Sequence, residues 1–127
     1  KNLRWAAVFQ EDRLLEGLDA AGNLRFVLGA AYDDSQAKTL LGALGLGDVG
    51  GKKVCDYSGG MKRRLALARA LLAPCDALAL DEPFTGLDRA SRDAALGAVL
   101  RAAEEKIVLL AAHETLALPT HCGEVKL

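Results

Sequence analysis

Three short apolar runs, separated by longer helical segments, place the strongest limit on what this chain can fold into. They span residues 5–9, 77–80 and 107–112, and the longest is the size of a strand, well short of the ~20 residues that cross a bilayer as a helix. Continuous apolar runs are typical of buried strands in parallel sheets. Because strands that alternate with helices form parallel sheets with crossover connections, the pattern predicts an α/β fold with buried strands.

Residues 12–52 are predicted to form an all-helical insertion between the first two strands. Asn23 is the expected N-cap of one helix, and Asp34 or Ser35 is the expected N-cap of another. Glycines cluster at 45–51 and are expected to end the helical pattern in a linker.

Two longer helices and a last strand are expected in the remainder of the chain. The first helix covers 59–73 and is closed by Pro74, which cannot continue it. The second covers 89–105, with Asp88 as its N-cap. A short strand is expected at 124–127.

Composition excludes several classes of protein. The 127 residues carry 16 basic and 17 acidic side chains, which argues against attachment to nucleic acid by bulk charge. The three cysteines are widely spaced without a C-x-x-C pair, so a disulfide framework or a structural zinc site is not expected. His121 and Cys122, close to a proline, are interpreted as structural. The first residues lack the apolar core of a signal peptide.

Polar side chains follow each of the three apolar runs: Gln10, then Asp81 with Glu82, then His113. The carboxyl ends of parallel strands lie at one edge of the sheet, where ligand crevices form, so these residues are expected to lie together. Two adjacent carboxylates suit a site in which one holds a divalent cation and the other acts as a base towards water. Taken singly, each has an ordinary alternative as a turn or capping residue, and only their convergence favours a site.

The start of the 59–73 helix is a second candidate site. Ser58, Gly59 and Gly60 present a hydroxyl and free backbone N–H groups, and the glycines let a ligand approach closely. The three cations at 62–64 are disfavoured by the helix dipole there, and an arriving anion would reverse that effect. The alternative is an ordinary N-capped helix with a solvated basic start.

Together these motifs resemble those of the ATP-binding cassette (ABC) ATPase family. In chain order they are similar to the Q-loop at 8–15, the signature motif at 57–61, Walker B at 77–83, the D-loop at 86–88 and the H-switch at His113. Five motifs in the family's order are far more specific than any one. The Glu-Asp-Arg-Leu-Leu sequence at 11–15 is similar to that of nitrate, sulfonate and taurine importers, whereas Tyr57 and Met61 depart from the commoner Leu and Gln of the signature.

The resemblance implies a fold and its division. A partial P-loop NTPase (RecA-like) core with a parallel sheet is expected to carry an inserted ABC-type helical subdomain. The core strand and Q-loop occupy 1–11, the subdomain occupies 12–52, and the remainder of the core occupies 53–127.

The resemblance also implies that the chain takes part in ATP hydrolysis with Mg²⁺. Gln10 is expected to contact the metal and the attacking water and to sense a membrane partner. Asp81 is expected to bind Mg²⁺ through water, and Glu82 to polarise the attacking water. His113 is expected to contact the γ-phosphate. Hydrolysis of this kind depends on positioning and charge neutralisation.

A second group is implied to act across a dimer. Ser58, Gly59 and Gly60 are expected to contact ATP held by the opposite subunit, and Asp88 to lie at the dimer interface. The implied partners are a second ABC ATPase subunit, identical or different, and an integral-membrane permease, with no direct nucleic acid. The implied location is the cytoplasmic face of the cell membrane.

The sequence departs from the family in lacking G-x-x-x-x-G-K-[ST], the P-loop that holds the phosphates. The single Gly-Lys pair, Gly51-Lys52, has leucine at the position where the first glycine is required and lysine after it. The chain is therefore expected to correspond to the later part of a cassette and to be inactive alone. A signature-donating non-catalytic partner, an ATPase acting on DNA or ribosomes, and a non-functional fragment remain as alternatives.

Overall fold

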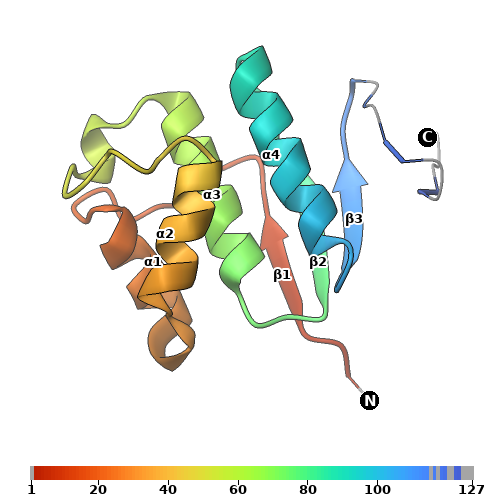
Figure 1. Cartoon of the computed structure of the whole chain (residues 1–127), viewed down its shortest axis with the longest axis horizontal. Coiled ribbons are helices and arrows are strands. Elements are labelled where there is room, and N and C mark those ends of the chain that lie inside the picture. The colour runs from red at the N-terminus through yellow and green to blue at the C-terminus, as the bar shows by residue number, and fades with distance from the viewer. Residues whose placement is uncertain (1, 115, 117, 120–121, 124–127) are drawn as a thin grey trace.

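A computed structural model describes residues 2–114, 116, 118–119 and 122–123. Within them, a three-stranded parallel sheet has the order β1-β2-β3, with β1 at Trp5–Val8, β2 at Ala77–Asp81 and β3 at Ile107–Ala111. The predicted α/β fold with a parallel sheet is confirmed. The strands point the same way (Figure 1), so their carboxyl ends share one edge.

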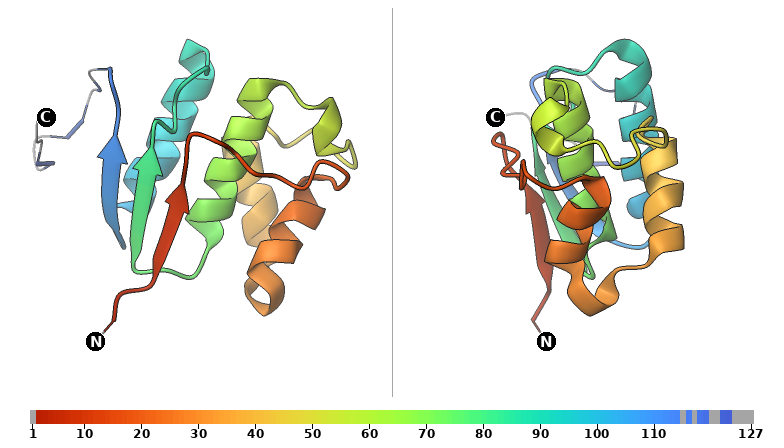
Figure 2. Two further views of the ribbon diagram at one scale, coloured as in Figure 1. Left: turned by 180° about the vertical axis from the view of Figure 1, so that it is seen from behind. Right: turned by 90° about the vertical axis from the view of Figure 1, so that its left-hand side faces the viewer.

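The helices of the described residues lie on one face of this sheet, as the end-on view in Figure 2 shows. They are α1 (Ala20–Leu28), α2 (Asp34–Ala43), α3 (Gly59–Leu72) and α4 (Arg89–Ala102), with short 3₁₀ turns η1 (Gly29–Ala31) and η2 (Val54–Asp56) between them. The opposite face of the sheet has no helix of the described residues over it.

Helix α3 is the central element of the core. It contacts β1, α1, α2 and α4, and its fully buried Leu65 packs in one continuous cluster with Leu24 of α1, Leu44 after α2 and Leu78 of β2. Helices α1 and α2 lie within the predicted insertion and α4 lies outside it, and all three pack on α3. The predicted insertion therefore shares its core with the rest of the chain.

Two predicted N-caps are wrong. Helix α1 begins earlier, with Asp19 as the N-cap that accepts a hydrogen bond from the Gly22 amide, while Asn23 lies inside the helix. Helix α2 is capped by Asp33 rather than by either of its two successors. In each case a preceding aspartate takes the capping role because its carboxylate reaches an amide three residues on.

The prediction that the first apolar run is a buried strand is also wrong, and the same face of β3 is exposed as well. Trp5, Ile107 and Leu109 are 54 %, 54 % and 57 % exposed, because helices cover only one face of the sheet. Strand β1 ends at Val8, one residue early, and α4 ends three residues before its predicted limit at 105. The predicted strand at 124–127, and His121, lie outside the described residues.

Candidate functional site

The polar residues that follow the three strands meet in one hollow at the carboxyl edge of the sheet. Its volume is about 500 Å³, and its lining includes Gln10 after β1, Glu82 after β2 and His113 after β3. The ladder explains this meeting, since Val8 pairs with Leu80 and Asp81 pairs with Ala111. Strands in this register end side by side, as expected from the sequence.

Glu82 is held on several sides within this hollow. One carboxylate oxygen lies 3.1 Å from His113 Nε2, and the other accepts a hydrogen bond from the Thr85 hydroxyl at 3.1 Å. Its side chain is only 14 % exposed, whereas that of His113 is 89 % exposed. The Glu82 amide donates to the Ala111 carbonyl at 2.9 Å. The carboxylate is therefore fixed in orientation while one flank stays open to solvent.

The backbone of Glu82 has a φ of +52°, in the left-handed region that few side chains other than glycine adopt. Such a conformation costs about 1–3 kcal/mol and persists only when surrounding contacts enforce it. Residues in this state cluster at functional sites. Glu82 adopts this conformation directly after the end of β2, and it is one of the residues that line the hollow.

Arg63 is a central residue of the site that the sequence did not reveal. It is 6 % exposed, and its guanidinium donates to the carbonyls of Phe9 and Gln10 at 2.6 and 3.1 Å, and to those of Asp81 and Glu82, the former at 2.9 Å. The sequence interpretation grouped it with solvated cations at the helix start. Its spacing in α3 was the available signal, because position 63 shares a helical row with the apolar positions 66, 67 and 70.

Asp12 and Thr85 were also missed. Asp12 Oδ1 accepts from Arg63 at 2.9 Å, and both Asp12 and Thr85 line the hollow. Each sits two or three residues beyond a predicted site residue, where no spacing rule distinguishes a contact from an ordinary loop position.

The start of α3 lies next to the hollow. Ser58 is the N-cap and accepts from the Met61 amide at 3.1 Å, as predicted, and Gly59 and Gly60 line the hollow. A Cβ on Gly60 would lie 3.6 Å from Leu87 Cδ2, which is an ordinary contact. The glycines therefore expose the first amides of α3 without being required by packing.

Asp81 and Asp88 lie outside the lining of this hollow. Asp81 is the last residue of β2 and is half-buried. Asp88 caps α4 as predicted, and its carboxylate accepts from the Ser91 amide at 2.7 Å. That backbone hydrogen bond lowers the pKa of Asp88 below the usual aspartate value.

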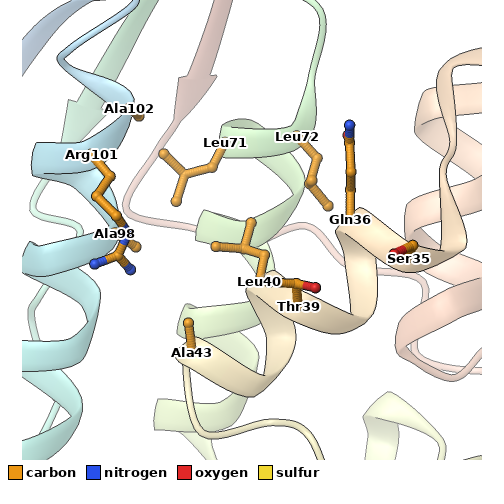
Figure 3. A pocket seen from close by; sticks show the side chains of 10 residues that line it. All are labelled: Ser35, Gln36, Thr39, Leu40, Ala43, Leu71, Leu72, Ala98, Arg101 and Ala102. Carbon is orange, nitrogen blue, oxygen red and sulfur yellow. The ribbon is translucent and has the colours of Figure 1, made fainter.

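A second hollow, of about 400 Å³, lies between α2, α3 and α4 and contains none of the predicted site residues. Figure 3 shows Leu40 of α2 and Leu71 of α3 projecting into it, with Arg101 of α4 at its side. Its described lining is mainly apolar and holds the hydroxyls of Ser35 and Thr39 but no histidine, carboxylate or cysteine that could activate them.

The oxygen atoms near the carboxyl edge fit the chemistry of Mg²⁺. This ion takes oxygen ligands, usually one or two carboxylates with waters and substrate phosphates completing the octahedron. Glu82 and Gln10 in the lining of the hollow, and Asp81 at the end of β2, carry oxygen atoms of the kinds that Mg²⁺ binds. Within the described part of the chain, no cluster of three or more His, Cys, Asp and Glu side chains forms a cage for a metal.

The family model described as ABC transporter matches residues 1–85. The chain belongs to this family. Two similar ABC proteins are the taurine import ATP-binding protein of Mesorhizobium japonicum, 42 % identical over 69 % of this chain and 36 % of that protein, and an aliphatic sulfonates import ATP-binding protein of Burkholderia cenocepacia, 41 % identical over 70 % and 33 %. This ABC chain thus spans about a third of the length of the curated relatives that it matches.

Solved structures support the same fold. An ABC transporter ATP-binding protein from Pyrococcus furiosus superposes with a TM-score of 0.80 at 23 % identity, covering 90 % of this chain and 58 % of its own. The RNase-L inhibitor superposes with a TM-score of 0.71 at 29 % identity, covering 87 % and 22 %. The parallel sheet with its helices is therefore part of a P-loop NTPase core. Among the described helices of this ABC chain, none combines the length and the apolar character needed to cross a membrane.

Proposed function

We propose that this chain forms the hydrolytic and signature part of the ATP-binding subunit of an importing ABC transporter. The observation that carries the proposal is the partly buried Glu82 carboxylate, held by Thr85 and His113 beside Gln10. A carboxylate held next to an open hollow is suited to orient and activate water. The names of the relatives make taurine and aliphatic sulfonates the transported class to test first.

The roles follow from the chemistry of each side chain. Bound Mg-ATP would supply the phosphoryl group and the charge that the metal neutralises. Glu82 would orient the attacking water and hold its proton, and Asp81 with Gln10 would provide oxygen atoms for the metal. His113, exposed at the mouth of the hollow, donates towards the phosphate side. Positioning and charge stabilisation of this kind account for most of catalysis in phosphoryl transfer.

The remaining predicted residues suit contacts between subunits. Ser58, Gly59 and Asp88 are exposed, and the α3 amides favour an anion because of the helix dipole. We propose that Ser58, Gly59 and Gly60 contact ATP of a second subunit, and that Asp88 lies at that interface. Residues 12–52 would form the subdomain that meets a membrane permease, with 1–11 and 53–127 as core, at the cytoplasmic face of the membrane.

The decisive experiment is Glu82→Gln in the assembled transporter. The amide is nearly isosteric but cannot accept a proton, so the rate of phosphate release should fall by roughly 10²–10⁴-fold, the usual contribution of a general base. Binding of Mg-ATP, measured by equilibrium titration, should persist. Arg101→Gln, at the second hollow, is the control and should hydrolyse ATP at the unchanged rate. Full activity of Glu82→Gln would contradict the proposal.

A second candidate function is donation of the signature motif to an intact partner. The exposed Ser58 and Gly59 at the start of α3 favour it. Because the 127 residues contain no P-loop sequence, we expect them by themselves to bind Mg-ATP weakly. Mixing with a P-loop-bearing subunit should then raise hydrolysis, and Ser58→Arg should abolish the gain. Tight Mg-ATP binding by the isolated chain would contradict this expectation.

A further inference from the structure

The Arg63 side chain joins the ends of two strands. Its Nη1 donates to the Phe9 and Gln10 carbonyls, in the segment that follows β1, while its Nη2 donates to the Asp81 and Glu82 carbonyls at the end of β2. The two amino groups of one planar guanidinium thus serve two different loops. Since the guanidinium is almost fully buried, these bonds operate without competition from water and are strengthened accordingly.

The contact with Glu82 falls on the strained residue. Glu82 holds a φ of +52°, and its carbonyl is one of the groups that Arg63 binds. The amide of Glu82 is fixed by Ala111, so Arg63 supplies the restraint on the other side of the same residue. Releasing the carbonyl would let the backbone relax towards ordinary φ values and turn the carboxylate away from the hollow.

The positive charge of Arg63 is balanced by Asp12, in the loop that follows β1. Asp12 Oδ1 accepts from Nη1 at 2.9 Å, and its side chain is 22 % exposed. A buried cation is tolerated when an ionic partner and hydrogen bonds compensate its lost hydration. Asp12 lies two residues beyond Gln10, so a displacement of the 9–12 loop would remove both the counter-ion and the carbonyl acceptors.

We propose that Arg63 is a positioning residue that couples the conformation of Glu82 to the position of the 9–12 loop. The inference rests on the proposed function, since Glu82 is the base of that reaction. When the loop is seated, the guanidinium is held by Asp12 and pins the Glu82 carbonyl. When the loop moves, the restraint on the strained residue is lost. Movement of the loop therefore controls whether the carboxylate faces the hollow.

The fork geometry is required for this coupling. A lysine ammonium keeps the charge but is a single point donor, whereas guanidinium presents two amino groups in a fixed plane. Arg63→Lys should therefore retain the ion pair with Asp12 and lose the simultaneous grip on both loops. A role in charge balance alone would be preserved by lysine.

The first test measures backbone exchange without nucleotide. In the full protein, Arg63→Lys should raise hydrogen exchange at both 10–13 and 82–85. Arg64→Lys is the matched control, because Arg64 of the same helix donates to the Gly60 and Leu44 carbonyls, and it should raise exchange near 44–46 and leave 10–13 and 82–85 unchanged. Unchanged exchange at 82–85 in Arg63→Lys would overturn the coupling. Should this variant fail to fold, Asp12→Asn replaces it, with the same two outcomes.

The second test uses hydrolysis in the assembled transporter. Arg63→Lys should lower kcat by about 10–100-fold, the range expected for a displaced reacting group, with KM for ATP within about twofold because the phosphate-binding groups are untouched. Added guanidinium at millimolar concentration should partly restore kcat in Arg63→Ala. An unchanged kcat accompanied only by a lower melting temperature would reduce Arg63 to a structural role. Failure of the proposed function would instead appear as wild-type protein without hydrolysis, and the exchange test would still decide the coupling.

Discussion

Buried polar side chains, more than exposed ones, set the local geometry of this ABC chain. Arg63 and Asn23 are the buried polar residues among those described, and each satisfies backbone groups of a loop distant from its own helical turn. The Asn23 amide accepts from the Leu15 amide at 2.7 Å and donates to the Leu15 and Asp19 carbonyls at 3.0 Å each. Asn23 thus fixes the loop that leads from the 9–12 segment into α1.

Replacing Asn23 tests whether its hydrogen bonds to this loop stabilise the fold. Asn23→Leu keeps the branching and the number of heavy atoms of the side chain but leaves the Leu15 amide and carbonyl without their Asn23 partners, which should lower the free energy of unfolding by about 1–3 kcal/mol. The measurement is the midpoint of urea unfolding at an unchanged slope. Gln36→Ala, at an exposed position of α2, should change it by less than about 0.5 kcal/mol. An equal loss of unfolding free energy in the Asn23→Leu and Gln36→Ala variants would contradict a stabilising role for the Asn23 hydrogen bonds.

Residue identity alone predicted only part of the site. Gln10, Glu82 and His113 were predictable because each follows an apolar run, and register brings strand ends together. The buried state of Arg63 was not predictable from charge, because three successive cations at a helix start are usually solvated. Asn23 was predicted as a cap, and it instead bonds to a loop eight residues earlier, which only tertiary contacts reveal.

At the scale of elements, helix starts are set by aspartates whose carboxylates reach the first free amides. Asp19, Asp33 and Asp88 cap α1, α2 and α4, and Ser58 caps α3. Sequence patterning predicted the existence of these helices and the caps of α3 and α4. It misplaced the other two because adjacent Asp, Ser and Asn residues are all good caps, and the choice depends on how the preceding loop enters the helix.

The Asp88 cap of α4 makes a pH-dependent contribution to the stability of the fold. Because its hydrogen bond from the Ser91 amide lowers the pKa of Asp88 in the folded state, the ionised form stabilises the fold above the ordinary aspartate pKa. This contribution is lost as the pH falls through the lowered value. Asp88→Ala should therefore lower the melting temperature at neutral pH and approach the wild-type value in strong acid. A difference between the two proteins that stays constant from pH 7 to pH 2 would exclude the ionised cap.

At the scale of the whole molecule, the one-sided coverage of the sheet is the main departure from expectation. Parallel sheets are usually covered on both faces, which is why a buried strand was predicted at 5–9. Here Trp5, Ile107 and Leu109 form an exposed apolar surface. Sequence patterning cannot distinguish a strand buried by the described helices from one that exposes an apolar face, since both have the same composition.

The exposed face predicts self-association of the isolated 127 residues. Apolar surface on an open sheet favours pairing or aggregation. In sedimentation or light scattering, the apparent mass of the wild-type chain should rise with its concentration. The double substitution Ile107→Thr and Leu109→Thr should make that rise smaller. Leu3→Thr, exposed before β1, is the control and should have little effect. Monomeric wild-type chain at high concentration would contradict the expectation.

The ladder between β1 and β2 also has a consequence for the order of folding. Trp5 pairs with Ala77 and Val8 with Leu80, so β1 leaves the ribosome long before its only hydrogen-bonded neighbour in the described sheet is synthesised. The local helices α1 and α2 can form in the interval, whereas pairing across so long a loop carries a closure entropy and is slow. We expect this pairing to follow the formation of the local helices, so that Gln10 and Glu82 come together only after the chain through β2 has been made.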